Sequence, residues 1–378
     1  MKLRKIQSEA RFQTLQIGKL SQGCQRCRKG EKTTLFITGI CGGGCFYCPI
    51  SKERQADLQY ANERPIQTQK ELIEEIDVSQ SRGVAITGGE PLLKKERVQT
   101  YATALKEAFG EKFHIHLYTQ GIKGKFEGLE HLIDELRIHP KNSDHLRQML
   151  IETELFPVVG VELPAIPGNE QFIIDIAKIL AKIRPNSFLN LNELEISETN
   201  YRALIKRGFQ RKERSLAAVE GSKQTATEIL TWIGKATSLN AYFCSASVKD
   251  AMQLPNRLFL RAQNVSEEFD IIEDKPPNRG LLIRGVFRAK TPEEKDNLKL
   301  HIADIQKFIH QTLGTKVKID YEKYQLLLDP VLLSELTIES LRGITSIIFQ
   351  KFAVKVIPGI VEEYPTFIRL ETSFQPLL

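Results

Sequence analysis

The stretch Cys41-Gly-Gly-Gly-Cys45-Phe-Tyr-Cys48 brings three cysteines together on one short, glycine-rich segment. Cysteine thiolates are the usual protein ligands of iron–sulfur clusters, and a cubane cluster ordinarily takes four of them. No fourth cysteine follows nearby, so one iron would be left without a protein ligand. An incomplete protein shell is typical of a metal site that binds something else, as in catalytic zinc centres. The spacing therefore predicts an enzyme rather than a passive electron carrier.

The 378-residue chain is 41% hydrophobic and 26% charged, with a formal net charge of +6. Its length suggests two or three domains. Lys and Arg are scattered rather than clustered, so an RNA partner is allowed but not required. The sequence contains no apolar run of bilayer-spanning length and no apolar signal stretch near Met1. We therefore expect a cytoplasmic protein without a membrane or DNA partner, whose clustered cysteines bind metal rather than form disulfides.

Residues 33–240 alternate β-rich runs with amphipathic helical patterns, which predicts repeated βα units and a parallel sheet. The expected strands are 33–38, 83–87, 114–119, 135–139, 157–163 and 188–194. The expected helices are 68–76, 97–109, 129–134, 143–152, 169–183 and 225–236. The first strand runs directly into Cys41, at the end of the strand where barrel enzymes place their chemistry.

Polar residues recur on one face of the expected strands. Side chains alternate between the two faces of a strand, so His114, His116 and Tyr118 share a face. The same alternation recurs at Glu135, Arg137, Glu162, Asn190 and Asn192. A doubly wound sheet is buried on both faces and would be apolar throughout. The repeated pattern therefore favours an incomplete barrel around a polar ligand, although each single position is equally consistent with a satisfied core hydrogen bond.

The remaining sequence divides around a charged, proline-containing stretch. Residues 269–280 include Pro-Pro-Asn and break both periodicities, which predicts a linker. Beyond it, strands at 281–289, 347–356 and 366–373 with helices at 292–313 and 331–341 indicate a small α+β domain without a chemical motif. The expected domains are an N-terminal extension with a CxxC pair (1–32), a partial barrel (33–268), the linker (269–280) and the α+β domain (281–378).

Cys41-x3-Cys45-x2-Cys48, with the aromatic Tyr47 before the last cysteine, resembles the signature of the radical S-adenosylmethionine (radical SAM) enzymes. The segment Gly88-Gly89-Glu90-Pro91, at the end of the second expected strand, resembles that family's Gly-Gly-Glu-Pro. The resemblance covers roughly residues 30–240. It implies an α/β fold, a partial (β/α)6 radical SAM barrel, to which the smaller C-terminal α+β domain is added.

The resemblance also implies cofactors and a reaction. A [4Fe–4S] cluster on Cys41, Cys45 and Cys48 would bind SAM through its open iron, and Gly88–Pro91 would hold the methionine amino group. An electron from reduced ferredoxin or flavodoxin would cleave SAM to a 5′-deoxyadenosyl radical, which abstracts hydrogen from a substrate. The cofactors would supply the chemistry, while the barrel positions them and excludes water.

Other cofactor contacts are expected from weaker matches. Thr119-Gln120-Gly121 stands where many members have Thr-Asn-Gly, and the segment from Glu162 to Gly168 resembles the branch containing pyruvate formate-lyase activating enzymes. We expect Glu162, Asn190 and Asn192 to contact SAM or substrate, or else to line the barrel structurally, and Tyr47 to shield the cluster. The chain further resembles a mainly archaeal group related to those activating enzymes, which does not establish a glycyl-radical substrate.

Three further cysteines form a second candidate metal site. Cys24 and Cys27 form a CxxC pair before the first strand, and Cys244 follows the sixth βα unit. A barrel brings its first and last units together, so the three could hold an auxiliary cluster or a zinc ion. For the pair we expect a metal or redox role. Cys244 taken alone is better explained as a small buried hydrophobe.

The sequence leaves three functions open. The first is a radical SAM enzyme whose substrate is RNA, a protein or a small molecule. The second is a non-enzymatic iron–sulfur protein, against which Gly88–Pro91 and the polar strand faces argue. The third is a zinc-stabilised RNA-binding protein, but Cys41–Cys48 has no second ligand pair at the distance that zinc sites use.

Overall fold

The computed structural model describes residues 3–378, which form two compact units, up to Arg257 and from Leu258 onward. Met1 and Lys2, the start of the predicted N-terminal extension, lie outside the described residues. Within the described chain, no helix is both long and apolar enough to cross a bilayer. The domain boundaries expected from the sequence stay a prediction.

The first unit is built on an 11-stranded sheet. Its seven central strands run parallel and follow chain order: β3 (Thr33–Phe36), β6 (Gly83–Thr87), β7 (His114–Thr119), β8 (Glu135–Ile138), β9 (Val159–Ala165), β10 (Phe188–Glu193) and β11 (Asn240–Cys244). Antiparallel strands complete the two edges: β1 (Gln7–Glu9) and β2 (Thr14–Ile17) beyond β11, and β4 (Tyr60–Ala61) and β5 (Arg64–Pro65) beyond β3. Sequential parallel neighbours, joined by helices except between β7 and β8, are the arrangement of a (β/α) barrel, here with two separate edges.

This arrangement confirms the predicted α/β class and partial barrel, with two local corrections. The parallel part has seven strands rather than six, because residues 240–244 form β11 beside β10. No strand was predicted for that run, and its parallel pairing with Phe188–Asn192 of β10 identifies it. Residues 129–134 form turns rather than a helix. There Asp134 accepts a bond from the backbone N–H of Ile115, at 2.7 Å, which ties this segment to the start of β7.

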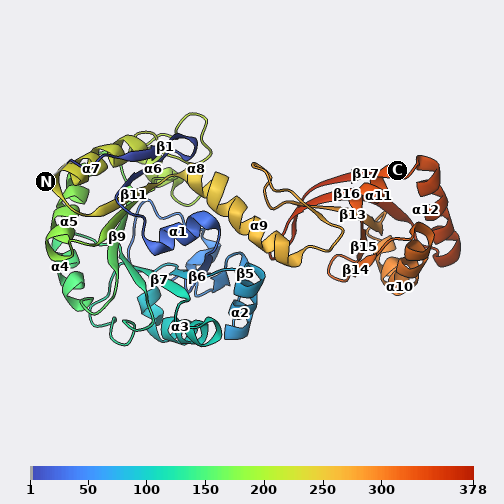
Figure 1. Ribbon diagram of the computed structural model, residues 1–378, viewed down its shortest axis with the longest axis horizontal. Helices are drawn as coiled ribbons and strands as arrows, with labels where there is room; N and C mark the ends of the chain where they lie inside the picture. Colours follow the sequence, from blue (N-terminus) through green and yellow to red (C-terminus); the bar gives the residue numbers. More distant parts are fainter. Residues whose placement is uncertain (1–2) are drawn as a thin grey trace. The chain divides into compact units, whose positions relative to one another are not determined.

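Amphipathic helices cover the outer side of the curved sheet (Figure 1). They are α2 (Gln69–Val78), α3 (Lys95–Phe109), α4 (Ser143–Glu152), α5 (Glu170–Ile183) and α7 (Ser222–Ala236). Helix α2 begins after Thr68, whose hydroxyl forms a capping box with Glu71. Helix α5 shows the packing rule, since Ile173, Ile176 and Leu180 share one face and are buried in the main core.

Helix α1 (Gln22–Lys29) lies inside the curve of the sheet, against its polar face (Figure 1). Its N-terminus is held by Glu135, which accepts bonds from Ser21 Oγ and Gly23 N, both at 3.0 Å. A Cβ on Gly23 would lie 2.7 Å from both Arg137 Nη2 and His116 Nδ1. The helix can therefore approach the buried charges only because position 23 has no side chain.

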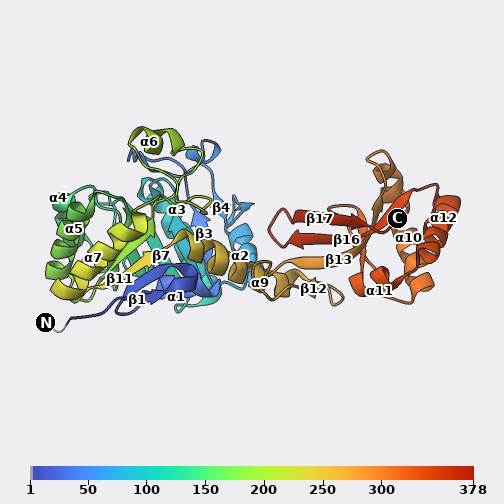
Figure 2. The same ribbon diagram turned by 90° about the horizontal axis from the view of Figure 1, so that it is seen from above.

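The second unit has a six-stranded antiparallel sheet (Figure 2). Its elements are β12 (Ile271–Ile272), β13 (Leu282–Ala289), α10 (Glu294–Leu313), β14 (Lys318–Asp320), β15 (Gln325–Leu328), α11 (Pro330–Glu335), α12 (Ile338–Phe352), β16 (Val356–Tyr364) and β17 (Leu370–Pro376). The strand order β14-β15-β13-β16 and the β-α-β-β-α-β connection are those of a ferredoxin-like split βαβ unit. The strand expected at 347–356 is wrong, because residues 347–352 finish α12 and keep Ile348 on its buried face.

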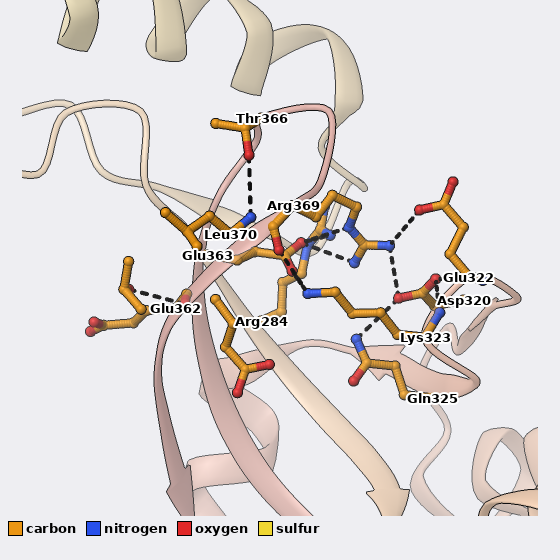
Figure 3. A network of polar contacts seen from close by, with 12 residues as sticks. Arg284, Asp320, Glu322, Lys323, Gln325, Glu362, Glu363, Thr366, Arg369 and Leu370 are labelled. Carbon is orange, nitrogen blue, oxygen red and sulfur yellow. Dashed lines mark hydrogen bonds and ion pairs between the residues drawn. The ribbon is translucent and has the colours of Figure 1, made fainter. Parts of the chain in front are cut away.

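A buried ionic network lies in the second unit (Figure 3). Glu363 is fully buried and accepts bonds from Arg284, from Lys323 Nζ at 2.7 Å and from Arg369 Nη2 at 2.9 Å. Lys323 and Arg369 come from the β14–β15 and β16–β17 connections. A carboxylate that is buried with several cations keeps its charge satisfied. The network therefore fixes these two connections to the sheet.

Two helical glycines give a matched stability prediction. Gly23→Ala should lower the free energy of unfolding by about 1–3 kcal/mol, because its Cβ overlaps the buried Arg137 and His116. Gly343→Ala in α12 meets no atom within 4 Å and should raise it by up to about 1 kcal/mol through helix propensity. Urea unfolding of both variants measures the expected decrease and the expected increase in the free energy of unfolding. A stabilising Gly23→Ala would contradict the close packing of α1.

Candidate functional site

A cavity of about 1110 Å3 opens at the C-terminal ends of the parallel strands and reaches the polar inner face of the sheet. Of the cofactor and metal residues predicted from the sequence, all but Glu90 line it: Cys24, Cys27, Cys41, Cys45, Tyr47, Cys48, Gly88, Gly89, Pro91, Thr119, Gln120, Glu162, Asn190, Asn192 and Cys244. His114, His116 and Glu135 of the predicted polar face are not among the residues that line it. Chain topology explains much of the convergence, because the carboxyl ends of neighbouring parallel strands meet at one edge. Cys24 and Cys27 come instead from α1, which lies inside the curve of the sheet (Figure 1).

The cysteine loop follows β3 and places three thiols in this cavity. A turn brings Cys48 N to 3.1 Å from Cys45 O. Cys41 Sγ accepts bonds from Gly43 N at 3.3 Å and from Gln120 Nε2 at 3.2 Å. Burial, together with the charges of the other two thiols, raises the pKa of Cys48. Among residues 3–378, no three Cys, His, Asp or Glu side chains already stand in a metal-binding group, so the ligand assignment stays a prediction.

The turn after β6 contacts the cysteine loop backbone to backbone. Gly89 N donates to Thr38 O at 2.7 Å, and Glu90 N donates to Ile40 O at 2.9 Å. A Cβ on Gly88 would lie 2.3 Å from Thr38 O, and one on Gly89 would lie 2.4 Å from Ile40 O. Gly88 also has a φ of +144°, which side-chain-bearing residues rarely adopt. Both glycines are therefore required for the two loops to meet.

Glu90 is directed into the protein rather than into the cavity. Its side chain is only 4% exposed, and it accepts bonds from Thr119 Oγ1 at 2.6 Å, Gln120 N at 2.7 Å and Leu92 N at 3.0 Å. The family resemblance implies that this residue contacts the SAM amino group. In the structure its carboxylate instead positions the Thr119-Gln120 turn, and Gln120 in turn contacts Cys41.

Asp57 braces the same loops, and no sequence pattern pointed to it. Its carboxylate accepts bonds from Thr38 Oγ1 at 2.8 Å, Arg97 Nη1 at 2.7 Å and Lys94 Nζ at 2.8 Å. Arg97 Nη1 also donates to Ile37 O at 2.7 Å. The bonds from Arg97, Lys94 and Thr38 hold the pKa of Asp57 well below its usual range. This carboxylate therefore joins the strand that enters the cysteine loop to the helix that follows Gly88–Pro91.

The inner end of the cavity is a hydrogen-bonded polar cluster. Glu162 accepts bonds from Arg137 Nη1 at 2.7 Å, Asn190 Nδ2 at 3.2 Å and Asn192 Nδ2 at 2.8 Å. Arg137 also donates to Tyr118 Oη at 2.8 Å. Burial alone would raise the pKa of Glu162, but Arg137 and the two amides hold it below its usual value. Much of the polar face predicted from the sequence is therefore paired internally, with its edges turned to the cavity.

Tyr47 fixes the cysteine loop to the cavity wall. Its hydroxyl lies 2.8 Å from His139 Nε2, and His139 Nδ1 lies 3.0 Å from Glu162 O. Burial raises the pKa of this hydroxyl. Asn200, just before α6 (Tyr201–Lys206), donates to Tyr47 O at 3.0 Å. The Phe46 ring packs edge-on against the Tyr47 ring. The loop is therefore anchored through Tyr47 as well as through its contact with the Gly88-Gly89 turn.

A π-helical turn at Lys249–Gln253 supplies part of the cavity wall and was not expected from the sequence. It follows the short helix α8 (Ala246–Val248) and leads into α9 (Leu254–Val265). Lys249 pairs with Glu195, which holds the lysine pKa above its usual value although burial opposes this. Such turns often occur at functional sites. The turn brings a charged pair and the amide of Gln253 to the cavity.

Comparison with known proteins relates the chain to one superfamily. The pattern of the radical SAM superfamily matches residues 35–143. A Methanocaldococcus jannaschii protein named "Putative glycyl-radical enzyme activating enzyme" is 37% identical over 376 residues, covering 95% of this chain and 93% of that protein. Crystal structures of Streptococcus suis SuiB and of SuiB bound to precursor peptide SuiA align with a TM-score of 0.40, at 13% and 14% identity. These alignments cover 57% of this chain but only 49% and 48% of the SuiB chains.

Asp57→Asn tests the brace through its pH dependence. The variant should lower the free energy of unfolding at neutral pH by about 1 kcal/mol, since a partly exposed ion pair is screened by solvent. The folded pKa lies below the unfolded value of about 3.9, so the wild-type advantage is complete at neutral pH and shrinks as pH falls below about 4. Urea unfolding from neutral pH to about pH 3 measures it. A stability advantage of the wild type over Asp57→Asn that grows as the pH falls would contradict the ionic role of Asp57.

Proposed function

The chain belongs to the radical SAM superfamily, and on that premise we propose that it binds a [4Fe–4S] cluster through Cys41, Cys45 and Cys48 and cleaves SAM. When bound, the cluster supplies the electron that breaks the sulfur–carbon bond of SAM, and the radical formed abstracts a substrate hydrogen. One observation carries the proposal. The three thiols and the Gly88-Gly89 turn line a single cavity, and their loops are joined by backbone hydrogen bonds.

The residues present fit these cofactors. Three thiols on one loop are the donor set that iron–sulfur clusters use. Gly42 and Gly44 meet no atom within 4 Å of an added Cβ, so the loop leaves open space beside the thiols. Gly88, Gly89 and Pro91 line the cavity next to that space and would present backbone groups to SAM. We assign Glu90 a positioning role, since its carboxylate orients Gln120.

The inner polar cluster is proposed to contact substrate or the SAM ribose. Glu162, Asn190 and Asn192 each line the cavity, and internal bonds hold their side chains in fixed orientations. Fixed polar groups orient a ligand without the entropic cost of ordering them during binding. Because the cationic and anionic side chains here are paired, the site favours a polar substrate with little net charge.

A backbone segment of a protein is the first substrate to test. The name of the Methanocaldococcus relative refers to activation of glycyl-radical enzymes, and a glycine-bearing loop is polar and without side-chain charge. The cavity of about 1110 Å3 leaves room for SAM and such a segment. RNA and small polar metabolites are the competing substrates, and reduced ferredoxin or flavodoxin is the proposed electron donor.

Cys45→Ala should abolish both cluster binding and SAM cleavage. Removing one of three thiolates leaves too few ligands to hold the cluster. We expect iron at the site to fall to background and 5′-deoxyadenosine formation with dithionite to drop by more than the roughly 10–100-fold that loss of an outer-shell partner of a metal ligand costs. Lys52→Ala is the control, because Lys52 is exposed on the same loop. Its iron content and cleavage rate should match the wild type.

The opposite result would reject the proposal. Full SAM cleavage by Cys45→Ala, or a reconstituted wild-type protein with a cluster but no 5′-deoxyadenosine, would exclude this site as the source of the radical. A colourless wild-type protein with bound zinc at this loop would favour a structural metal instead.

A further inference from the structure

Three cysteines outside the proposed cluster line the same cavity. Cys24 and Cys27 lie three residues apart on α1, so both side chains fall on one helix face. Cys244 ends β11, directly beside Asn192 in the neighbouring strand. The two segments are more than 200 residues apart in the sequence. The curve of the sheet therefore brings together thiols from its first and last elements.

One side chain connects Cys27 and Cys244. Cys27 Sγ donates to Gln253 Oε1 at 3.0 Å, and Gln253 Nε2 donates to Cys244 Sγ at 3.5 Å. A single amide thus contacts both sulfur atoms, so only the amide group of Gln253 lies between the two thiols. Gln253 comes from the π-helical turn, whose irregular backbone presents it to the cavity.

The third thiol lies among polar donors rather than in an apolar core. Cys24 is 7% exposed, and its sulfur accepts bonds from Asn190 Nδ2 at 3.2 Å and Arg137 Nη2 at 3.4 Å. A structural free cysteine usually packs as a small hydrophobe. Amide and guanidinium donors around sulfur are instead typical of the surroundings of thiolate ligands, whose charge they stabilise.

From this arrangement we propose that Cys24, Cys27 and Cys244 form a second metal centre, a thiolate site for zinc or for a further iron–sulfur cluster. Binding releases the thiol protons, as metal ligation by cysteine requires. It also requires the amide of Gln253 to leave its place between Cys27 and Cys244. The centre goes beyond the proposed radical chemistry, which needs only the cluster on Cys41, Cys45 and Cys48.

The test removes the first site so that only the second can bind. The full chain with Cys41→Ala, Cys45→Ala and Cys48→Ala is loaded anaerobically with zinc alone, or with ferrous iron and sulfide, and desalted. We expect about one zinc, or about four irons with matching sulfide, per chain. The matched control adds Cys24→Ala, Cys27→Ala and Cys244→Ala and should hold neither metal. Zinc retention identifies a zinc site, and retained iron with sulfide and visible absorbance identifies a cluster.

The proposal would be overturned if the variant with three cysteine substitutions and the control with six bound the same background amount of metal per chain. Far-UV circular dichroism must show that both variants are folded. Because this readout comes from protein without the first cluster, it does not depend on SAM cleavage. Wild-type protein gives a second measurement that needs no variant. Alkylation of Cys27, followed by peptide mass spectrometry, should slow by about tenfold or more on metal loading and recover with a chelator. An unchanged rate, or protection that only a disulfide reductant reverses, would overturn the metal centre.

Discussion

The site depends on a backbone contact that tolerates no side chain. In the turn after β6, Gly89 N donates to Thr38 O and Glu90 N donates to Ile40 O, while Gly88 and Gly89 pack closely against the same two carbonyl oxygens. Thr38 and Ile40 lead into the cysteine loop after β3. Neighbouring parallel strands bring the two turns to one edge, but only two consecutive glycines allow the carbonyl oxygens to approach this closely. The three thiols therefore line the same cavity as the groups proposed to bind SAM.

Side chains on both sides then hold that contact in place. Asp57 joins Thr38 to Arg97, while Glu90 joins its own turn to Thr119 and Gln120. Each carboxylate accepts bonds from more than one element, so neither loop can move independently of the other. Functional groups of an enzyme work best when the surrounding shell fixes their orientation. Glu90 is thus a structural neighbour of the proposed cofactor site.

Much of this site could be predicted from the sequence. The placement of Cys41–Cys48 and Gly88–Pro91 at one edge follows from the βα pattern, because the carboxyl ends of parallel strands always meet there. The direction of the Glu90 carboxylate could not be predicted, since it is set by contacts with Thr119 and Gln120 some thirty residues away. Asp57 and the π-helical turn were missed for the same reason. Their roles depend on tertiary neighbours and not on a local pattern.

Hydrogen transfer from substrate to 5′-deoxyadenosine is the direct measure of the radical chemistry proposed for this cavity. The reduced, reconstituted enzyme is incubated anaerobically with SAM and an extract from cells grown in heavy water, after exchangeable deuterium has been washed out. We predict 5′-deoxyadenosine carrying one deuterium, taken from a carbon–deuterium bond of the substrate. Formation of 5′-deoxyadenosine without deuterium, or no formation of 5′-deoxyadenosine, would contradict hydrogen abstraction from a substrate in this cavity.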